Sequence, residues 1–393
     1  MAFADFFSPD YARAKNRFLA AATRAGCRLE SFNIGARGPS GEALSIDVAV
    51  LGRPQPARLL LLSSGIHGVE GFFGSAVQLA WLEQQAAHAA LPADTAIVFV
   101  HALNPYGFAW RRRWNEHNVD LNRNFIDDRS FLAGDPDYAL SQRIYGSLNA
   151  FLNPGTPPSR FEPYALKAAG IVLSHGLRAR ANMPAAGRPG LFVLAQLVGL
   201  GVAELERALT AGQYEHPDGL FYGGDDTQVS TSIMREQAAV WAGAVETVIH
   251  VDLHTGLGTS GHYQLLIEDE EGSARAAWLE QRFGAANVTA RRAGETFRSH
   301  GLMASWLERR FVDRRYHCLI AEFGTCPPIR VLGALRAERR AHLYSAPGSA
   351  THEWAKRELM EVFCPASTSW REAVVTQGLD IMARALRALA DKS

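Results

Sequence analysis

The sequence predicts an α/β protein built on a single mixed, largely parallel β-sheet flanked by helices. Short β-rich apolar runs alternate with longer segments of helical periodicity, which is the pattern of an α/β sheet. Hydrophobic residues make up 47% of the 393 residues and charged residues 20%, so the chain can bury a full core. Strands are expected at Leu44–Leu51, Arg58–Ser63, Thr95–His101, Thr247–Leu253, Tyr263–Glu268 and His317–Phe323. Helices are expected at about 9–25, 72–88, 137–152, 201–212, 229–244, 273–284, 329–344 and 368–390.

Local patterns justify these elements in chain order. The first helix follows Ser8-Pro9 and is amphipathic. The segment Leu59–Ser63 is a continuous apolar run that ends near a glycine, as a buried strand does. Thr247–Leu253 is rich in β-branched residues, and 262–267 alternates between polar and apolar residues. The last helix, WREAVVTQGLDIMARALRALA, carries apolar residues at helical spacing and is expected to pack on the sheet.

The charge balance excludes some classes of partner. The chain has 40 Lys and Arg against 40 Asp and Glu, so it lacks the basic footprint of a nucleic-acid-binding protein. No apolar run approaches the roughly 20 residues of a membrane span, so we expect no membrane partner. A reduced, cytoplasmic setting is favoured because the four cysteines are scattered and form no C-x-x-C pair.

The first motif with chemical character is GIHGVEG, which follows the expected strand Arg58–Ser63. It places His67 and Glu70 at positions i and i+3, at the carboxyl end of a strand, where open α/β sheets form their sites. At that spacing an imidazole and a carboxylate can converge on one ion, and Zn²⁺ accepts such ligands. Alone the pattern is weak, because a surface histidine beside a solvated glutamate would look the same.

The second motif runs from Asn104 to Phe125 and follows the strand Thr95–His101. It contains NPYGF, three consecutive arginines and VDLNRNF, so cationic residues are interleaved with aromatic residues that indicate partial burial. Arginine in such a setting suits recognition of a carboxylate or an oxyanion. For Arg112 and Arg113, a solvated basic loop is the alternative interpretation.

Two later strands also end in residues with chemistry. Thr247–Leu253 delivers His254 to its carboxyl end, where a third metal ligand would be needed, while His250 is expected to be a hydrogen-bonded core histidine. Glu322 lies at the end of the apolar strand His317–Phe323, and a carboxylate is costly to bury there unless it has a partner or a task. Accepting a proton from water at a nearby metal would be such a task.

The run Gly256–Gly261 matches the dinucleotide pattern G-x-G-x-x-G and follows a strand. A dinucleotide site would require a helix immediately afterwards, because the helix N-terminus holds the pyrophosphate. The next residues alternate like a strand instead. We therefore do not expect a dinucleotide cofactor.

Together, GIHGVEG, NPYGF, the Trp-Arg pair, VDLNRNF, DLH and AEFGT resemble, in order, the motifs of the zinc carboxypeptidase (M14-like) metallopeptidases, and more closely their bacterial DUF2817-type branch. The resemblance spans residues 65 to 325, about two-thirds of the chain. It implies a zinc carboxypeptidase-like, phosphorylase/hydrolase-like architecture. We expect residues 1–393 to form one catalytic domain with an elaboration at about 130–245.

The resemblance also implies a metal site and a base. His67, Glu70 and His254 would be the ligands of Zn²⁺, and Asp120 would orient His67 from behind. Glu322 would be the general base.

Substrate contacts follow from the same resemblance. Asn122 and Arg123 would clamp a substrate carboxylate. Arg111 would stabilise the oxyanion, with its neighbours Arg112 and Arg113 leaving the register open.

The family also has a tyrosine between its last histidine ligand and its base. Tyr263 and Tyr316 are the tyrosines of this chain in that interval, and neither lies in a recognisable version of the family's loop.

Three functions stay open at this level. The first is a zinc hydrolase that cleaves an amide beside a free carboxylate, as in a small peptide. The second is an aspartoacylase-like deacylase of small N-acyl amino acids, which would use the same ligands. The third is a catalytically inactive binding protein of this fold, against which the full set of ligands and base argues. A serine hydrolase is disfavoured because the chain has no G-x-S-x-G motif.

Overall fold

The computed structural model describes residues 2–84, 91–92, 94–162, 164, 170, 210–291 and 299–391. The strands of this part are β1 (Arg28–Arg37), β2 (Ala43–Gly52), β3 (Arg58–Ser64), β4 (Thr95–His101), β5 (Thr247–Gly256), β6 (Tyr263–Glu270), β7 (Val288–Arg291) and β8 (Arg315–Gly324). The helices are α1 (Tyr11–Arg24), α2 (Gly71–Gln84), α3 (Pro105–Ala109), α4 (Pro136–Leu152), α7 (Val229–Ala242), α8 (Ala274–Phe283), α9 (Met303–Arg310), α10 (Pro328–Tyr344), α11 (Ala350–Phe363) and α12 (Thr368–Ala390).

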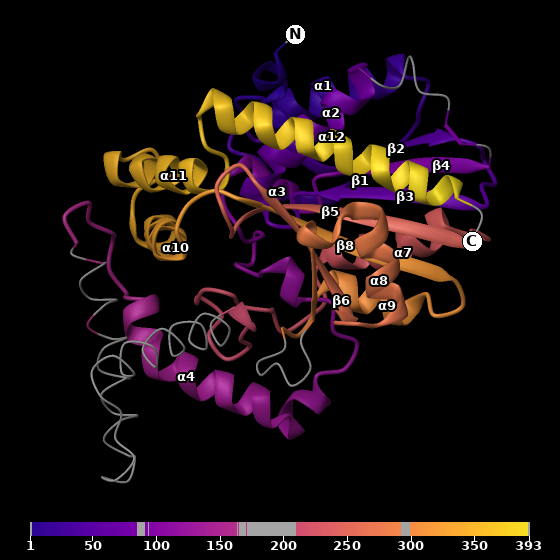
Figure 1. Cartoon of the computed structure of the whole chain (residues 1–393). Helices are drawn as coiled ribbons and strands as arrows, with labels where there is room; N and C mark the ends of the chain where they lie inside the picture. Colours follow the sequence, from indigo (N-terminus) through magenta and orange to yellow (C-terminus); the bar gives the residue numbers. More distant parts are fainter. Residues whose placement is uncertain are drawn as a thin grey trace.

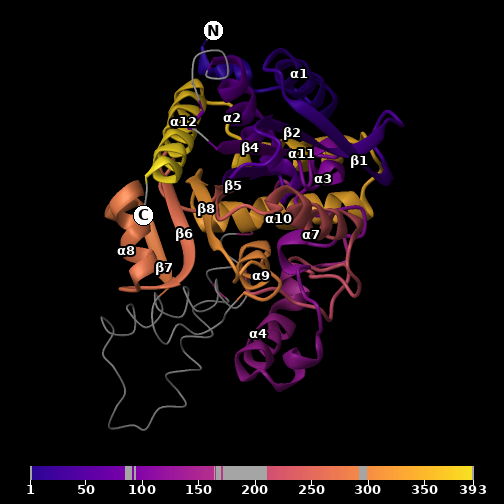
Figure 2. The same cartoon turned by 90° about the vertical axis from the view of Figure 1, so that its right-hand side faces the viewer.

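All eight strands form one sheet in the order β1-β2-β4-β3-β5-β8-β6-β7. The central strands β4, β3, β5 and β8 are parallel, whereas β2 and β6 join them antiparallel on either side. Helices α1, α2 and α12 cover one face of this sheet, and α4 and α9 lie on the opposite side (Figures 1 and 2). The predicted mixed, largely parallel sheet flanked by helices is confirmed.

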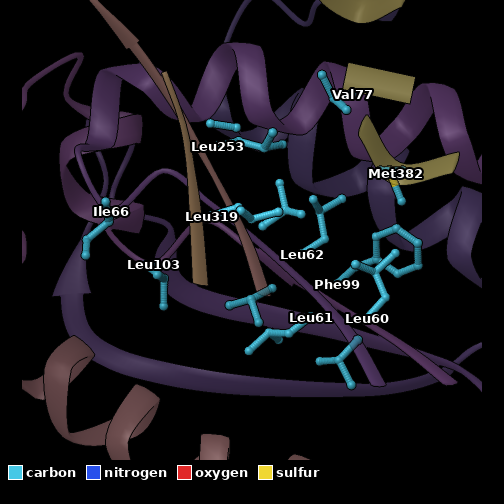
Figure 3. Close-up of a cluster of buried hydrophobic side chains, with 14 of the residues drawn as sticks. Leu60, Leu61, Leu62, Ile66, Val77, Phe99, Leu103, Leu253, Leu319 and Met382 are labelled. Carbon is cyan, nitrogen blue, oxygen red and sulfur yellow. The ribbon is translucent and has the colours of Figure 1, made fainter. Parts of the chain in front are cut away.

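The central strands are buried on both faces, which explains their continuous apolar sequence. Leu60, Leu61 and Leu62 of β3 are at most 2% exposed and lie in the main core with Phe99 and Met382 (Figure 3). A second apolar cluster joins α4, α10 and α11, and it includes Leu148, Leu335 and Phe363. This second cluster matters for the candidate site described below.

The six predicted strands are confirmed, with β5 and β8 extending further than expected. Strands β1 and β7 were not predicted. β1 is an edge strand with mostly exposed or half-buried residues, and β7 has only four residues, so neither produces a strong apolar signal. Helices α3, α9 and α11 were also missed, and most of the predicted helix 201–212 lies outside the described residues.

Helix α12 packs along the sheet, as its apolar spacing predicts (Figure 1). Its N-cap is Ser367, whose side chain accepts a hydrogen bond from the Trp370 backbone N–H. In the part of the chain that the structure describes, we find no helix long and apolar enough to cross a membrane.

Candidate metal centre and active site

The candidate site forms where three neighbouring parallel strands end. β3, β5 and β8 are adjacent, and Ser64 lies opposite Leu253 while His254 lies opposite Glu322. The chain leaves β3 and reaches His67 within three residues. The carboxyl ends of these strands therefore bring the first motif, His254 and Glu322 to one place, as the sequence predicted.

His67, Glu70 and His254 present ligand atoms that all lie within 4.8 Å of one another. His67 Nδ1 is 2.9 Å from Glu70 Oε1, and His254 Nδ1 is 3.2 Å from Glu70 Oε2. All three side chains are buried. Two imidazoles and a carboxylate that converge in this way fit a divalent metal, and this donor set is typical of catalytic zinc.

A second carboxylate lies behind each histidine. His67 Nε2 is 3.2 Å from Asp120 Oδ1, and His254 Nε2 is 2.6 Å from Asp252 Oδ2. If each Nε2 carries a proton, it donates a hydrogen bond to its carboxylate, and the lone pair of each Nδ1 can bind a metal. Burial raises the pKa of Asp120, but the charges of Arg113, His67 and Arg123 together outweigh it and hold that pKa well below its usual range.

The turn that carries His67 and Glu70 is anchored in the core. Ile66 is 1% exposed and lies in the apolar cluster next to His67, as Leu253 does next to His254 (Figure 3). The backbone of Gly68 runs against that of Gly107, because a Cβ on Gly68 would come within 2.3 Å of Gly107 Cα. This contact explains the glycine at position 68, whereas a Cβ on Gly107 would come within 2.9 Å of Asn104 Nδ2 and of the Trp114 and Arg112 carbonyl oxygens.

Glu322 lies in the same cavity as the candidate metal ligands and is not one of them. Its Oε1 accepts a hydrogen bond of 2.8 Å from the Leu257 backbone N–H. Burial, reinforced by the negative charge of Glu70, raises the pKa of Glu322 to about 7. A carboxylate of this kind can exchange a proton near neutral pH.

The structure does not bring Arg111 to the site. Arg111 adopts a left-handed backbone φ of 51°, and its half-exposed side chain pairs with Glu353 at 3.1 Å. Arg113 lines the cavity instead, with Nη2 2.7 Å from His67 Nε2 and Nε 3.1 Å from Asp120 Oδ2. Of the three arginines whose register the sequence left open, Arg113 is the one beside the candidate metal ligands.

Arg112 points away from the cavity and is 1% exposed. Its Nε donates to Glu338 Oε1 at 3.0 Å, and Lys356 Nζ donates to the same oxygen. The alternative of a solvated basic loop is therefore wrong for Arg112 and Arg113, because both side chains are buried. The Arg112–Glu338–Lys356 cluster ties the arginine loop to helices α10 and α11.

Arg123 and Asn122 both line the same cavity as the metal ligands. Arg123 donates from Nε to the Thr210 carbonyl oxygen at 2.9 Å and from Nη1 to that of Asn122 at 2.6 Å. Within the described ranges, no carboxylate forms an ion pair with Arg123. The guanidinium is thus fixed by backbone oxygens and has N–H groups left for another acceptor.

The cavity has a volume of about 470 Å³. Its described lining contains neither Tyr263 nor Tyr316. Tyr263 Oη accepts from Asn287 Nδ2, and Tyr316 Oη lies 2.9 Å from His250 Nδ1. The structure therefore places both tyrosines elsewhere.

Sequence reasoning missed Asp252. On β5, His250, Asp252 and His254 alternate onto one face, and Ser63 Oγ contacts Asp252 Oδ1 at 2.5 Å and His250 Nε2 at 2.7 Å. The period of two along this strand was the signal that could have found Asp252. His250 itself is a buried, hydrogen-bonded core residue, as predicted.

A family model described as "Protein of unknown function (DUF2817)" matches residues 7–189 and 191–377. The chain belongs to the DUF2817 family. This confirms the predicted DUF2817 membership. No curated protein matches the chain.

Solved structures similar to this DUF2817 protein include the carboxypeptidase A from Helicoverpa armigera, at 11% identity and a TM-score of 0.48, with 98% of this chain and 74% of that chain covered. Bovine thrombin-activatable fibrinolysis inhibitor, in complex with tick carboxypeptidase inhibitor, is 10% identical with a TM-score of 0.41, and the match covers 96% of this chain and 99% of that chain. A metallo-carboxypeptidase from Burkholderia cenocepacia is 11% identical with a TM-score of 0.39, and the match covers 94% of this chain and 69% of that chain. Similarity at this level is not evidence for a shared activity.

Proposed function

We propose that this protein is a zinc-dependent hydrolase that cleaves an amide bond near a free carboxylate. The observation that carries the proposal is the convergence of His67 Nδ1, His254 Nδ1 and the Glu70 carboxylate, with a further acid, Glu322, beside them in one cavity. Three protein ligands with an open position are typical of catalytic zinc, whereas structural sites are closed by a fourth ligand.

His67, Glu70 and His254 would hold the ion. When bound, Zn²⁺ supplies Lewis acidity, which polarises a substrate carbonyl and lowers the pKa of water to about 7. With Oε1 held by the Leu257 N–H, Glu322 keeps Oε2 to accept a proton and later deliver it to the leaving nitrogen.

Arg113 is the cation best placed to stabilise charge on the carbonyl oxygen. When His67 Nε2 carries a proton, it donates a hydrogen bond to Asp120 and can no longer accept one from Arg113 Nη2. Arg113 Nη2 is then free to donate to the substrate. Arg123 and Asn122 would bind the carboxylate of the substrate, because a guanidinium pairs with a carboxylate through two parallel hydrogen bonds.

An aspartoacylase-like deacylase of small N-acyl amino acids is the second candidate, because it would need the same ligands, base and carboxylate clamp. A catalytically inactive binding protein is the third, and the position of Glu322 beside the ligands argues against it. The cytoplasmic location and the absence of nucleic-acid and membrane partners stay predictions.

Metal analysis followed by a substrate panel tests the proposal. We expect close to one zinc per chain, lost in His67→Ala or His254→Ala, and hydrolysis of peptides or N-acyl amino acids with a free carboxylate. Glu322→Gln should keep its zinc and lose about 10²–10⁴-fold in kcat. Near-normal kcat in this variant would contradict the role of Glu322 as the base. A zinc-loaded protein that cleaves no member of the panel would contradict the proposed hydrolase function.

A further inference from the structure

The cavity that holds the candidate metal ligands has two chemically different ends, and helix α4 runs past both. In its middle, Gln142 Nε2 donates to the Gly212 carbonyl oxygen at 3.0 Å, and Gly212 lies directly against the Arg123 side chain. In its last turns, Leu148 and Leu152 line the cavity. Arg123 is therefore linked through Gly212 to the middle of α4, whereas Leu148 and Leu152 belong to its last turns.

The end beside Leu148 and Leu152 is built from apolar side chains of three helices and one loop. These residues belong to the second apolar cluster, in which α4, α10 and α11 pack together. Those lining the cavity are Leu148, Phe151, Leu152, Phe221, Val331, Leu332, Leu335 and Phe363. Val69, the neighbour of Glu70, packs in the same cluster. The apolar end therefore begins directly at the metal ligands.

Few charged side chains line the cavity, and Arg113 is the one that reaches the apolar end, where its guanidinium lies over the Phe221 ring. In the described lining, the charged side chains other than the proposed metal ligands are Arg113, Arg123, Glu268 and Glu322. Two large apolar side chains of the lining also stay open to solvent, since Leu257 is 40% exposed and Ile329 is 44% exposed. Apolar surface left open in a concave site is typical of a binding site for an apolar group.

We propose that the substrates are N-acyl amino acids whose acyl group is an apolar chain of several carbons. This inference rests on the proposed hydrolase function. Arg123 would bind the carboxylate of the amino acid, and the acyl chain would lie among Leu148, Leu152 and the apolar side chains packed with them. Hydrolysis would break the amide C–N bond, transfer the water oxygen to the acyl carbon as a carboxylate, and release the nitrogen as the free amine of the amino acid.

Binding to zinc-loaded Glu322→Gln tests the apolar end without turnover. The ligands are N-acetyl-, N-butanoyl-, N-hexanoyl- and N-octanoyl-leucine, measured by calorimetry. We expect Kd to fall about two- to fourfold for each added methylene until the cavity is full, because each buried methylene contributes a similar hydrophobic gain. Equal Kd values from acetyl to octanoyl would overturn the proposal.

A matched pair of substitutions on α10 locates the chain. Leu332→Gln changes a half-buried leucine of the lining, and Leu343→Gln changes a leucine of the same helix that is 37% exposed and not in the lining. Introduced into Glu322→Gln, Leu332→Gln should weaken N-octanoyl-leucine binding fivefold or more and leave N-acetyl-leucine unchanged. Leu343→Gln should alter neither. The same loss of octanoyl binding in both variants would reject the proposed location.

Turnover by the protein with Glu322 intact tests the hydrolase function and the apolar acyl preference separately. A kcat/KM that rises with chain length supports the substrate class. Equal kcat/KM for N-acetyl- and N-octanoyl-leucine would leave the hydrolase standing and overturn the apolar acyl preference. Chain-length-dependent binding with no hydrolysis of any acyl-leucine or peptide would overturn the hydrolase, and the substrate assignment with it.

Discussion

Arg113 and Arg111 are two residues apart in sequence and have different surroundings. Arg113 contacts His67 and Asp120, whereas Arg111 pairs with Glu353 on α11. We predict that Arg113→Ala lowers kcat by about 10²–10³-fold, the usual loss for one oxyanion donor, while zinc content is retained. Arg111→Ala is the matched control and should keep near-normal kcat. A larger loss of kcat in Arg111→Ala than in Arg113→Ala would assign the oxyanion role to Arg111 instead.

Asp252 has no proposed contact with substrate, yet it holds His254 from behind at 2.6 Å. We predict that Asp252→Asn weakens zinc affinity about 10–100-fold, as loss of such a partner typically does. Competition with a chelator measures this directly.

Asp47 provides the control for Asp252. Asp47 lies on β2 and is also a fully buried carboxylate of the sheet, but it accepts hydrogen bonds from Ser31 on β1 and Ser45 on β2. Asp47→Asn should lower stability and leave zinc affinity unchanged. Equal zinc affinity in wild type and Asp252→Asn would contradict the role of Asp252.

At the residue scale, the sequence predicted the convergence of His67, Glu70 and His254 better than the residues that hold them. His67 and Glu70 come from one motif and His254 from one strand end, so strand order alone brings them together. The arginine register was not predictable in the same way. It depends on the left-handed φ of Arg111, which turns the chain between one arginine and the next and which no residue pattern encodes.

At the scale of elements, the α10–α11 pair is fastened to the arginine loop by a buried ion cluster. Glu338 is fully buried and accepts from Arg112 and Lys356, which hold its pKa at about 2 against the effect of burial. We predict that Glu338→Gln costs roughly 3–5 kcal/mol of unfolding free energy, because it leaves two buried cations without their anion. Urea unfolding measures the loss.

Glu353→Gln is the control on the same pair of helices. Glu353 forms a partly exposed ion pair with Arg111, and such pairs contribute only about 0–1 kcal/mol. Equal losses in the two variants would show that the Glu338 cluster does not fasten the helices.

The elements that sequence patterns missed share a physical cause. β1 has a mostly exposed or half-buried surface, and its pairing with β2 is long-range information that local periodicity does not contain. The central strands were predicted well because burial on both faces demands continuous apolar sequence.

At the scale of the whole molecule, buried histidines should make the fold sensitive to acid. Burial lowers the pKa of His101 to about 3, of His317 to about 4 and of His342 to about 3. The unfolded chain therefore binds these protons first as pH falls below about 6.5. Each histidine contributes stability that is complete above that pH and is lost by about 1.4 kcal/mol per pH unit toward its folded pKa.

His101 offers a test of this effect away from the metal ligands. It is fully buried, stacks on Phe18 and contacts Ser75. Between pH 7.5 and 5.5, His101→Gln should lose about 1 kcal/mol less unfolding free energy than wild type in urea titrations. The exposed His117→Gln should follow the wild type. Identical losses in wild type and His101→Gln would show that His101 does not contribute.

Helix α4 lies beside both ends of the cavity and supplies none of the proposed metal ligands, base or arginines. Mutations in its last turns can therefore reshape the space available to a substrate while the reacting groups stay where the sheet puts them. Selection for a different substrate can therefore act on this helix without changing the reacting groups. We therefore expect substrate preference to respond to changes in α4, and the reaction itself to respond to changes at the strand ends.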